Sequence, residues 1–448
     1  MTAEELSRHH TADDCWMAIL GNVYNLTDFL KTHPGGREIL LRFAGKDATR
    51  AFQQKHPVGF LATLPASCLV GRLDGASVTP VAAGPGSWKK PPLDQHLNVR
   101  DFEKTAEQVM DHAAWVYYAS AAEDERTLEE NQGAFRRWWF RPRVLVDVSR
   151  VDTTTTVLGQ PTSFPAFISA SAVAGLAHPE GEVALARAAH AAGIVQMVPT
   201  ISTRPLGEIA AARAPGQSQF FQLYANRERT QTEMLVRKVE ALGFRGLFLT
   251  VDTPFIGRRE RDIRNKFASG QGVIRSLGTI SDPSLTWEYV DWLRSLTTMP
   301  LVLKGVQRGD DAVTAAEHGV AGLLVSNHGG RQLDGARASL DALVEVRQAL
   351  GAKSPVEVFV DGGIRRGSDI VKALALGARA VGVSRAVLFG LASYGQEGAE
   401  AVLNLLHEEF SLCMALNGAR RVEEISPDLV ERHLRTRRGN GPACMSNG

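Results

Sequence analysis

Short apolar runs and amphipathic stretches alternate along most of the chain, from about residue 93 to residue 438. Eight apolar runs have the length and composition of buried parallel strands, and helical patterns such as 180–192, 229–242 and 367–376 lie between them. This alternation predicts an α/β protein whose larger part is a (β/α)8 TIM barrel. The eight predicted strands are Phe164–Ser169, Ile194–Val198, Gln219–Leu223, Gly246–Val251, Leu301–Leu303, Ala321–Val325, Val356–Val360 and Ala380–Val383.

Polar and ionisable residues gather directly after these strands, where a TIM barrel carries its chemistry. A solenoid or a doubly wound sheet would not predict this clustering as well. The residues at the strand ends are Ala170, Ser171, Ala172, Pro199, Thr200, Ile201, Gln222, Tyr224, Thr250, Asp252, Lys304, His328, Arg331, Asp361, Gly362, Gly363, Ser384 and Arg385.

The stretch LLVSNHGGRQLD (323–334) opens a predicted strand into a polar loop. His328 and Arg331 stand three positions apart around a Gly-Gly turn, so both can face one small anion. The arginine suits a carboxylate clamp and the histidine suits a base, which indicates proton abstraction from an acid substrate. A lone pair of this kind would more often be a surface histidine and a solvated arginine, but its place at a barrel strand end favours the functional interpretation.

Asp252, Arg259 and Lys304 are expected at the same barrel mouth. Burial beside an aspartate is expected to favour the protonated imidazolium of His328, with Asp252 as its orienting partner. Two arginines around one site indicate a carboxylate substrate.

The turn 361–366 (DGGIRR) and the pair Ser384 and Arg385 follow the last two predicted strands. Loops at this position of the barrel often bind phosphate through backbone N–H groups, which predicts a phosphorylated cofactor. Lys304 would then place positive charge near the redox ring of that cofactor.

The first 74 residues form a separate unit with its own apolar positions. His33 and His56 each stand before a proline, at the mouth of a loop between predicted helices, and two such imidazoles can fill both axial positions of a haem iron. The motifs VYNLTDFLKTHPGG (23–36) and AGKDATRAF (44–52) resemble the cytochrome b5 fold, a small α+β haem domain. The resemblance implies that His33 and His56 bind the iron of haem b.

A stretch rich in Gly, Ala, Ser and Pro (75–92) predicts a linker to the barrel part, 93–448, which ends in a tail. The composition is that of an ordinary globular protein, with 44% hydrophobic and 22% charged residues and a net charge of +1. This balance gives no sign of a nucleic-acid or anionic-membrane partner. Cys15, Cys68, Cys413 and Cys444 are scattered without metal-type spacing and are expected to be reduced.

The barrel part resembles the FMN-dependent L-2-hydroxy acid oxidases and dehydrogenases, through TVDTPFIGRRERD (250–262), SNHGGRQLD (326–334) and DGGIRRG (361–367) among other motifs. The resemblance implies that His328 removes the substrate α-proton with Asp252 as its partner, that Tyr224 bonds the substrate hydroxyl, and that Tyr117, Arg259 and Arg331 bind the carboxylate. It implies FMN contacts from Ala170, Ser171, Ala172, Gln222, Thr250 and Lys304, and phosphate contacts from Asp361, Gly362, Gly363, Arg365, Ser384 and Arg385.

Three positions depart from the family pattern. Pro199 replaces a residue with a hydroxyl group near the flavin, and Thr200 is a candidate to supply the missing hydrogen bond. Ser384 stands where glycine is usual, so its side chain is expected either to crowd the phosphate or to bond it. Ile201 replaces a large aromatic found in some members, which predicts a pocket with room beyond glycolate.

The joining of a haem domain to this barrel resembles the flavocytochrome b2 group of L-lactate dehydrogenases. The resemblance implies oxidation of an L-2-hydroxy acid such as L-lactate, cytochrome c or a similar electron acceptor, and a homotetramer. The alternatives are an oxidase that uses oxygen, a dehydrogenase for a larger acid such as mandelate, and a haem or ligand sensor without turnover. The chain shows no transmembrane segment or signal peptide, so the expected locations are the cytoplasm or, if a targeting segment has been removed, the mitochondrial intermembrane space.

Overall fold

The computed structural model describes residues 1–31, 33, 36–53, 61, 64, 66–73, 88–269 and 281–433. These residues form two compact units. The smaller unit contains Met1–Pro92 with Val109–Tyr118 and Arg261–Gly272, as far as these ranges are described, and the larger unit contains the rest. His56, Cys444 and residues 75–87 of the expected linker lie outside the described residues.

The amino-terminal part of the smaller unit is an α+β fold built on an antiparallel sheet in the order β1-β2-β3-β4. Apolar side chains from β2, β3 and the flanking helices form one core that includes Met17, Ile19, Tyr24 and Phe52. The elements are β1 (His10–Thr11), β2 (Asp14–Ile19), β3 (Asn22–Asn25), β4 (Leu69–Arg72), α1 (Ala3–Ser7), α2 (Arg37–Phe43), α3 (Thr49–Gln53), η1 (Asp28–Lys31) and η3 (Ala66–Cys68). Two later helices, α5 (His112–Ala119) and most of α10 (Glu260–Ser269), belong to the smaller unit as well.

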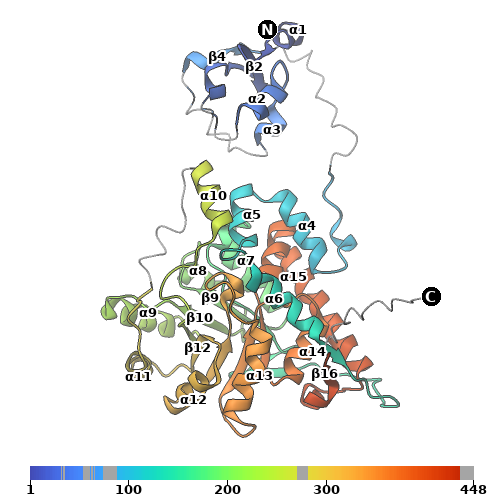
Figure 1. Cartoon of the computed structure of the whole chain (residues 1–448), viewed down its shortest axis with the longest axis vertical. Helices are drawn as coiled ribbons and strands as arrows, with labels where there is room; N and C mark the ends of the chain where they lie inside the picture. The colour runs from blue at the N-terminus through green and yellow to red at the C-terminus, as the bar shows by residue number, and fades with distance from the viewer. Residues whose placement is uncertain are drawn as a thin grey trace, which may run out of the picture. The chain divides into compact units, whose positions relative to one another are not determined.

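The larger unit is a closed barrel of eight parallel strands, seen among its covering helices in Figure 1. Neighbouring strands run β8 to β15 in chain order, and β15 pairs with β8 to close the barrel. All eight strands predicted from the apolar runs are present, so the fold prediction is confirmed. Their bounds are β8 (Ala166–Ile168), β9 (Val195–Pro199), β10 (Gln219–Leu223), β11 (Leu247–Thr250), β12 (Leu301–Val306), β13 (Gly322–Val325), β14 (Glu357–Asp361) and β15 (Ala380–Val383).

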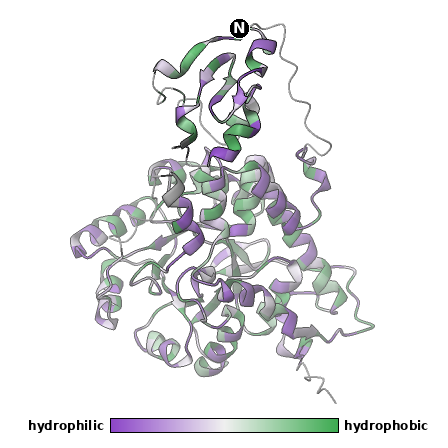
Figure 2. Cartoon of the chain, turned by 45° about the horizontal axis from the view of Figure 1, so that its top comes forward, coloured by the Kyte–Doolittle hydropathy of each residue, from purple (hydrophilic) through white to green (hydrophobic). Residues whose placement is uncertain are grey.

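Helices follow the strands and cover the barrel. The three helices singled out from the sequence occur as α7 (Gly181–Ala191), α9 (Arg229–Ala241) and α14 (Gly367–Ala375). Figure 2 shows hydrophilic and hydrophobic residues side by side on the outer helices, as expected for helices that bury one face. The other helices of this unit are α4 (Val99–Val109), α6 (Arg126–Ala134), α8 (Leu206–Ala211), α11 (Trp287–Leu296), α12 (Gly309–Glu317), α13 (Ser339–Leu350) and α15 (Arg385–Leu416).

Two short antiparallel pairs complete the unit, β5 (Trp138–Phe140) with β16 (Val430–Arg432) and β6 (Thr155–Val157) with β7 (Gln160–Thr162). No helix in the described part of the chain is long and apolar enough to cross a membrane.

Buried aromatic side chains fill the barrel interior. Phe167, Phe220, Phe248 and Phe359 are fully buried, and the Phe167 and Phe359 rings meet edge to face with centroids 5.8 Å apart. The interior is therefore a packed core, and polar chemistry is confined to the ends of the strands.

The fifth strand was predicted three residues too short at its end. The sequence placed the end of the fifth strand at Leu303, but β12 continues to Val306 and contains Lys304. The register with β13 shifts between Lys304 and Val306, around Gly305 at φ 113°. The apolar run Leu301–Leu303 does not predict such a β-bulge, because a glycine after an apolar run is also typical of a strand end.

Candidate active site

A histidine and an aspartate from two strand ends form the centre of the site. Asp252 follows β11, and His328 begins the 3-10 turn η8 (His328–Gly330) after β13. Their side chains meet with 2.9 Å between His328 Nδ1 and Asp252 Oδ1. The hydroxyl of Tyr224 lies 3.4 Å from His328 Nε2, on the other edge of the ring.

The protonation states of this pair follow from burial and from the charge of Lys304. Burial opposes ionisation of Asp252, but the charge of Lys304 and the interactions with His328 outweigh it and lower its pKa to about 2. Asp252 is therefore a carboxylate that only accepts hydrogen bonds, so the proton of the imidazole sits on Nδ1. Nε2 then carries the lone pair that a base needs.

The sequence-based expectation that burial beside Asp252 favours the protonated form of His328 is wrong, because the pKa of His328 is lowered. Burial and the positive charge of Lys304 lower the pKa of the imidazole, and these effects exceed the opposite influence of Asp252. The resting histidine is thus neutral, and the protonated form expected from the aspartate alone is disfavoured. The sequence does not give the distances that decide whether Lys304 or Asp252 has the larger effect on the pKa of His328.

Lys304 brings its ammonium group into the same buried region. Its Nζ lies 4.0 Å from Asp252 Oδ2, and both side chains are 6% exposed. Neither atom has a hydrogen-bond partner among the described residues. A buried ammonium and a buried carboxylate oxygen in this state indicate that a polar ligand completes the site.

The two arginines expected at the carboxylate site are held by backbone carbonyls. Arg331 donates from Nη1 to the carbonyl of Ser120 at 2.8 Å, and Arg259 donates from Nε to the carbonyl of Arg331 at 3.3 Å. Arg259 is buried. Tyr117, the remaining residue predicted for the carboxylate, is buried on α5 in the smaller unit.

The residues predicted to contact a flavin lie at the ends of neighbouring strands. Gln222 donates from Nε2 to Thr250 Oγ1 at 2.8 Å, and Thr200 Oγ1 donates to the Gln222 carbonyl at 2.6 Å. Thr200, considered as a substitute for the hydroxyl missing at Pro199, is therefore engaged with this strand end. Ser171 and Ser384 are joined through their hydroxyl oxygens at 2.7 Å, so Ser384 has a partner within the protein. Ala170 and Ala172 flank Ser171 in the loop after β8.

The predicted phosphate site is a tight turn beside a surplus of positive charge. Gly362 and Gly363 follow Asp361 with φ values of 94° and 85°, which only glycine adopts easily. Arg385 is partly buried near Arg365 and Arg331, and desolvation together with these like charges lowers its pKa to about 9. It stays protonated at neutral pH, so the cluster favours an anion.

Arg365 has a partner that the sequence did not indicate. Its Nη1 and Nη2 donate to the two carboxylate oxygens of Glu103 on α4, at 2.9 and 3.1 Å. The bidentate pair fixes the guanidinium of Arg365.

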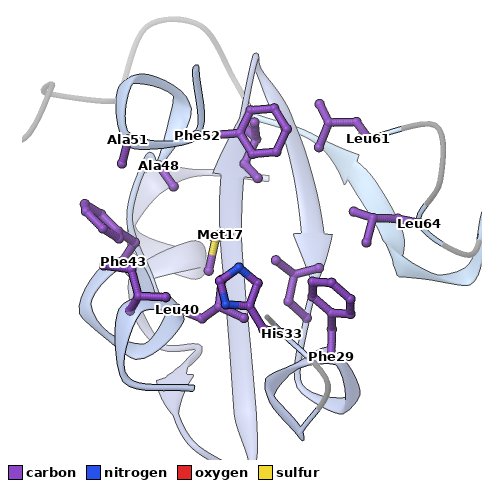
Figure 3. Close-up of a pocket in the computed structure, with 13 residues that line it drawn as sticks. Met17, Phe29, His33, Leu40, Phe43, Ala48, Ala51, Phe52, Leu61 and Leu64 are labelled. Carbon is purple, nitrogen blue, oxygen red and sulfur yellow. The ribbon is translucent and has the colours of Figure 1, made fainter. Parts of the chain in front are cut away.

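A second candidate site is an apolar cavity in the smaller unit. Figure 3 shows the His33 imidazole pointing into it between Met17, Leu40 and Phe29. His33 Nδ1 lies 3.1 Å from the carbonyl of Gly36, which orients the ring and leaves Nε2 as the nitrogen with a lone pair. The cavity is lined by Met17, Ile19, Leu26, Phe29, His33, Ile39, Leu40, Phe43, Ala48, Ala51, Phe52, Leu61 and Leu64.

Comparison with known proteins agrees with both sites. Residues 106–432 match the model of the FMN-dependent dehydrogenases, and residues 2–74 match that of the cytochrome b5-like haem/steroid-binding domain. The chain belongs to the FMN-dependent dehydrogenase family.

Relatives of this dehydrogenase include proteins with and without the amino-terminal part. An L-lactate dehydrogenase (cytochrome) of Wickerhamomyces anomalus is 44% identical, over 96% of this chain and 80% of that protein. An L-lactate oxidase of a Nostoc species is 46% identical, over 75% of this chain and 99% of that protein. The flavin-binding domain of baker's yeast flavocytochrome b2 superposes with a TM-score of 0.73 at 43% identity, covering 76% of this chain and 88% of that one.

The cofactors of this dehydrogenase are FMN and haem b, and its own residues fit both. Lys304 and Asp361 each bury a polar atom without a hydrogen-bond partner among the described residues. Arg385 lies near Arg365, Arg331 and Asp361, and this cationic cluster fits an anionic flavin nucleotide. The cavity around His33 offers apolar walls and one imidazole, as a haem macrocycle requires.

Several residues around the site were not anticipated. Thr253 donates from Oγ1 to Asp252 Oδ1 at 3.0 Å and could have been found as the neighbour of a strand-end aspartate. Glu103, Ser120 and Asn131 come from segments before the barrel, and only the fold shows that they reach it.

Proposed function

We propose that this dehydrogenase oxidises an L-2-hydroxy acid to the 2-keto acid, with L-lactate as the expected substrate, and passes the electrons through haem b to cytochrome c or a similar acceptor. The observation that carries the proposal is the neutral His328 held by an ionised Asp252 beside Lys304. The name of the Wickerhamomyces relative, which is similar over both parts of the chain, supports this substrate and acceptor.

The residues around His328 have complementary roles in this proposal. His328 Nε2 takes the α-proton of the substrate, and Asp252 stabilises the positive charge that the imidazole acquires. Tyr224 bonds the substrate hydroxyl from the same edge of the ring. Arg259 and Arg331 bind the carboxylate, and this binding orients the α-hydrogen toward the base. Tyr117 stays a predicted carboxylate ligand from the resemblance.

The cofactor sites are assigned in the same way. FMN, when bound, accepts the two electrons that the substrate loses and can release them one at a time. Lys304 supplies positive charge near the flavin ring, and Arg385, Arg365 and Ser384 surround the phosphate with the Gly362–Gly363 turn. The remaining contacts come from Ala170, Ser171, Ala172, Gln222, Thr250 and Asp361.

The amino-terminal part serves as a one-electron relay in this proposal. When haem b is bound, His33 and His56 would hold its iron, which would supply one-electron chemistry. We propose the boundaries 1–74 for the haem domain, 75–92 for a linker and 93–448 for the barrel domain with its tail. The homotetramer, and the cytoplasm or mitochondrial intermembrane space as location, stay predictions from the resemblance and the sequence.

An anaerobic stopped-flow experiment tests the function. The purified holoenzyme is mixed with L-lactate, and the flavin and haem absorption bands are followed separately. Bleaching of the flavin followed by reduction of the haem is the expected result.

Other results would select one of the alternatives. Flavin reduction by mandelate but not by L-lactate would assign a larger substrate. Flavin reduction without haem reduction, with rapid peroxide formation in air, would indicate an oxidase. A flavin that stays oxidised with every L-2-hydroxy acid would contradict the proposal and favour a sensor.

A further inference from the structure

Two buried asparagines join helix α6 to the loop that carries His328. Asn131 donates from Nδ2 to Asn327 Oδ1 at 2.8 Å, and Asn327 donates from Nδ2 to Asn131 Oδ1 at 2.8 Å. Both residues are at most 2% exposed. Because the pair is buried and reciprocal, each side-chain amide has a hydrogen-bond partner, and the distance between the two backbones is fixed.

Asn327 in turn shapes the backbone that presents His328. Its Oδ1 accepts a hydrogen bond from the N–H of Gly330 at 3.1 Å and closes the turn η8. His328 has a φ of 59°, in the left-handed region that is costly for a residue with a side chain. Such a conformation persists only where the surroundings hold it, and the asparagine pair is part of that support.

Asn131 also forms the floor of the phosphate turn. A Cβ atom at Gly363 would lie 2.0 Å from the backbone oxygen of Asn131, and one at Gly362 would lie 3.3 Å from its Nδ2. The turn therefore packs directly on this residue. Asn131 Oδ1 also accepts from the N–H of Ser339 at 3.2 Å, and Ser339 Oγ accepts from the N–H of Asn327 at 3.2 Å.

We propose that Asn131 is a positioning residue that couples the loop of His328 to the turn Asp361–Gly363, so that one side chain sets both the placement of the base and the binding of the cofactor phosphate. This inference rests on the proposed function, because it takes the turn as the phosphate site and His328 as the base.

The test compares Asn131→Asp with a matched control, Asn417→Asp. The first change keeps the side-chain volume but turns a donor toward Asn327 Oδ1 into a second acceptor. Asn417 is also buried and donates from Nδ2 to the carbonyl of Cys413 at 2.8 Å, near the end of α15. The control thus removes a comparable buried hydrogen bond outside the proposed active site.

Two readouts separate positioning from general destabilisation. The first is the dissociation constant of FMN, from quenching of flavin fluorescence on titration into apoprotein. The second is the pH at which the His328 imidazole titrates, from the NMR signal that the His328→Gln variant lacks. We expect Asn131→Asp to weaken FMN binding about tenfold or more, and to move the His328 titration toward its ordinary range because the loosened loop admits water.

Asn417→Asp is expected to keep the FMN dissociation constant within about twofold of wild type and to leave the His328 titration unchanged. This should hold even if its melting temperature falls as much as that of Asn131→Asp. Equal effects of the two variants, or a change in only one readout for Asn131→Asp, would overturn the coupling. If Asn131→Asp does not fold, Asn131→Ala is measured in its place by the same criteria. Neither readout needs turnover. If no 2-hydroxy acid reduces the flavin, the proposed function is contradicted, but the two readouts still test the coupling through Asn131.

Discussion

His328 and Asp252, 76 positions apart in the chain, are joined by a hydrogen bond of 2.9 Å between Nδ1 and Oδ1. The aspartate accepts and the imidazole donates, so the second ring nitrogen is directed away from the carboxylate. The ammonium of Lys304 stands on the other side of the carboxylate, 4.0 Å from Oδ2. These three groups set the protonation state of the base.

Replacing His328 by glutamine removes the base while both cofactors stay bound. We expect the rate of flavin reduction by L-lactate to fall by about 10²- to 10⁴-fold, the usual contribution of a general base. Anaerobic stopped-flow absorbance measures this rate. The matched control is His318→Gln, because His318 forms a comparable pair with Asp291 at 2.8 Å on α11. A normal rate in His328→Gln would remove this residue from the mechanism.

The variant Asp252→Asn changes both the rate and its pH dependence. Burial and Lys304 hold the pKa of His328 below its ordinary range, so kcat/KM should be level at neutral pH and fall only in acidic solution. Asp252 raises the pKa of His328, so replacing Asp252 by the neutral asparagine should lower that pKa. The fall of kcat/KM in acidic solution, the acid limb of the profile, should then move to lower pH. The plateau should fall about a hundredfold or more, because the charged imidazole loses its partner. Asp291→Asn is the control, and an acid limb that moves upward would contradict the assignment.

The variant Lys304→Met should shift the same limb in the opposite direction. Lys304 lowers the pKa of His328, so removing its charge should raise that pKa and move the fall in kcat/KM to higher pH. The pH profile is measured on protein whose FMN content is known from flavin absorbance. Lys372→Met is the control, since Lys372 donates to the carbonyl of Phe135 on the outer side of the barrel. Shifts of the same sign in the Asp252 and Lys304 variants would show that His328 is not the group that titrates.

The variant His33→Ala separates the two halves of the proposed electron path. It removes an imidazole from the apolar cavity, so the haem band should be lost while flavin reduction by L-lactate keeps its wild-type rate. Reduction of added cytochrome c should fall to background. His10→Ala, an exposed histidine of the same domain, should keep both activities. Undiminished cytochrome reduction in His33→Ala would show that electrons bypass the haem.

The sequence alone determined the fold class and the main members of the site. Buried parallel strands are short continuous apolar runs, and this local signal located all eight of them. Strand ends of a barrel meet at one rim, so the same pattern predicted that Asp252, Lys304 and His328 would be neighbours. The histidine of the HPGG motif was likewise expected at a haem site, and His33 lies in an apolar cavity.

Only the tertiary structure decided which nearby groups control these residues. Asn131 and Asn327 are 196 positions apart, and Glu103 reaches Arg365 across 262 positions. Such contacts depend on how the helices before the barrel pack over its rim, which no local pattern records. The pKa of His328 depends on burial and on the distances to one cation and one anion at once. Coulomb and desolvation energies are functions of spatial separation, and spatial separation exists only in the folded chain.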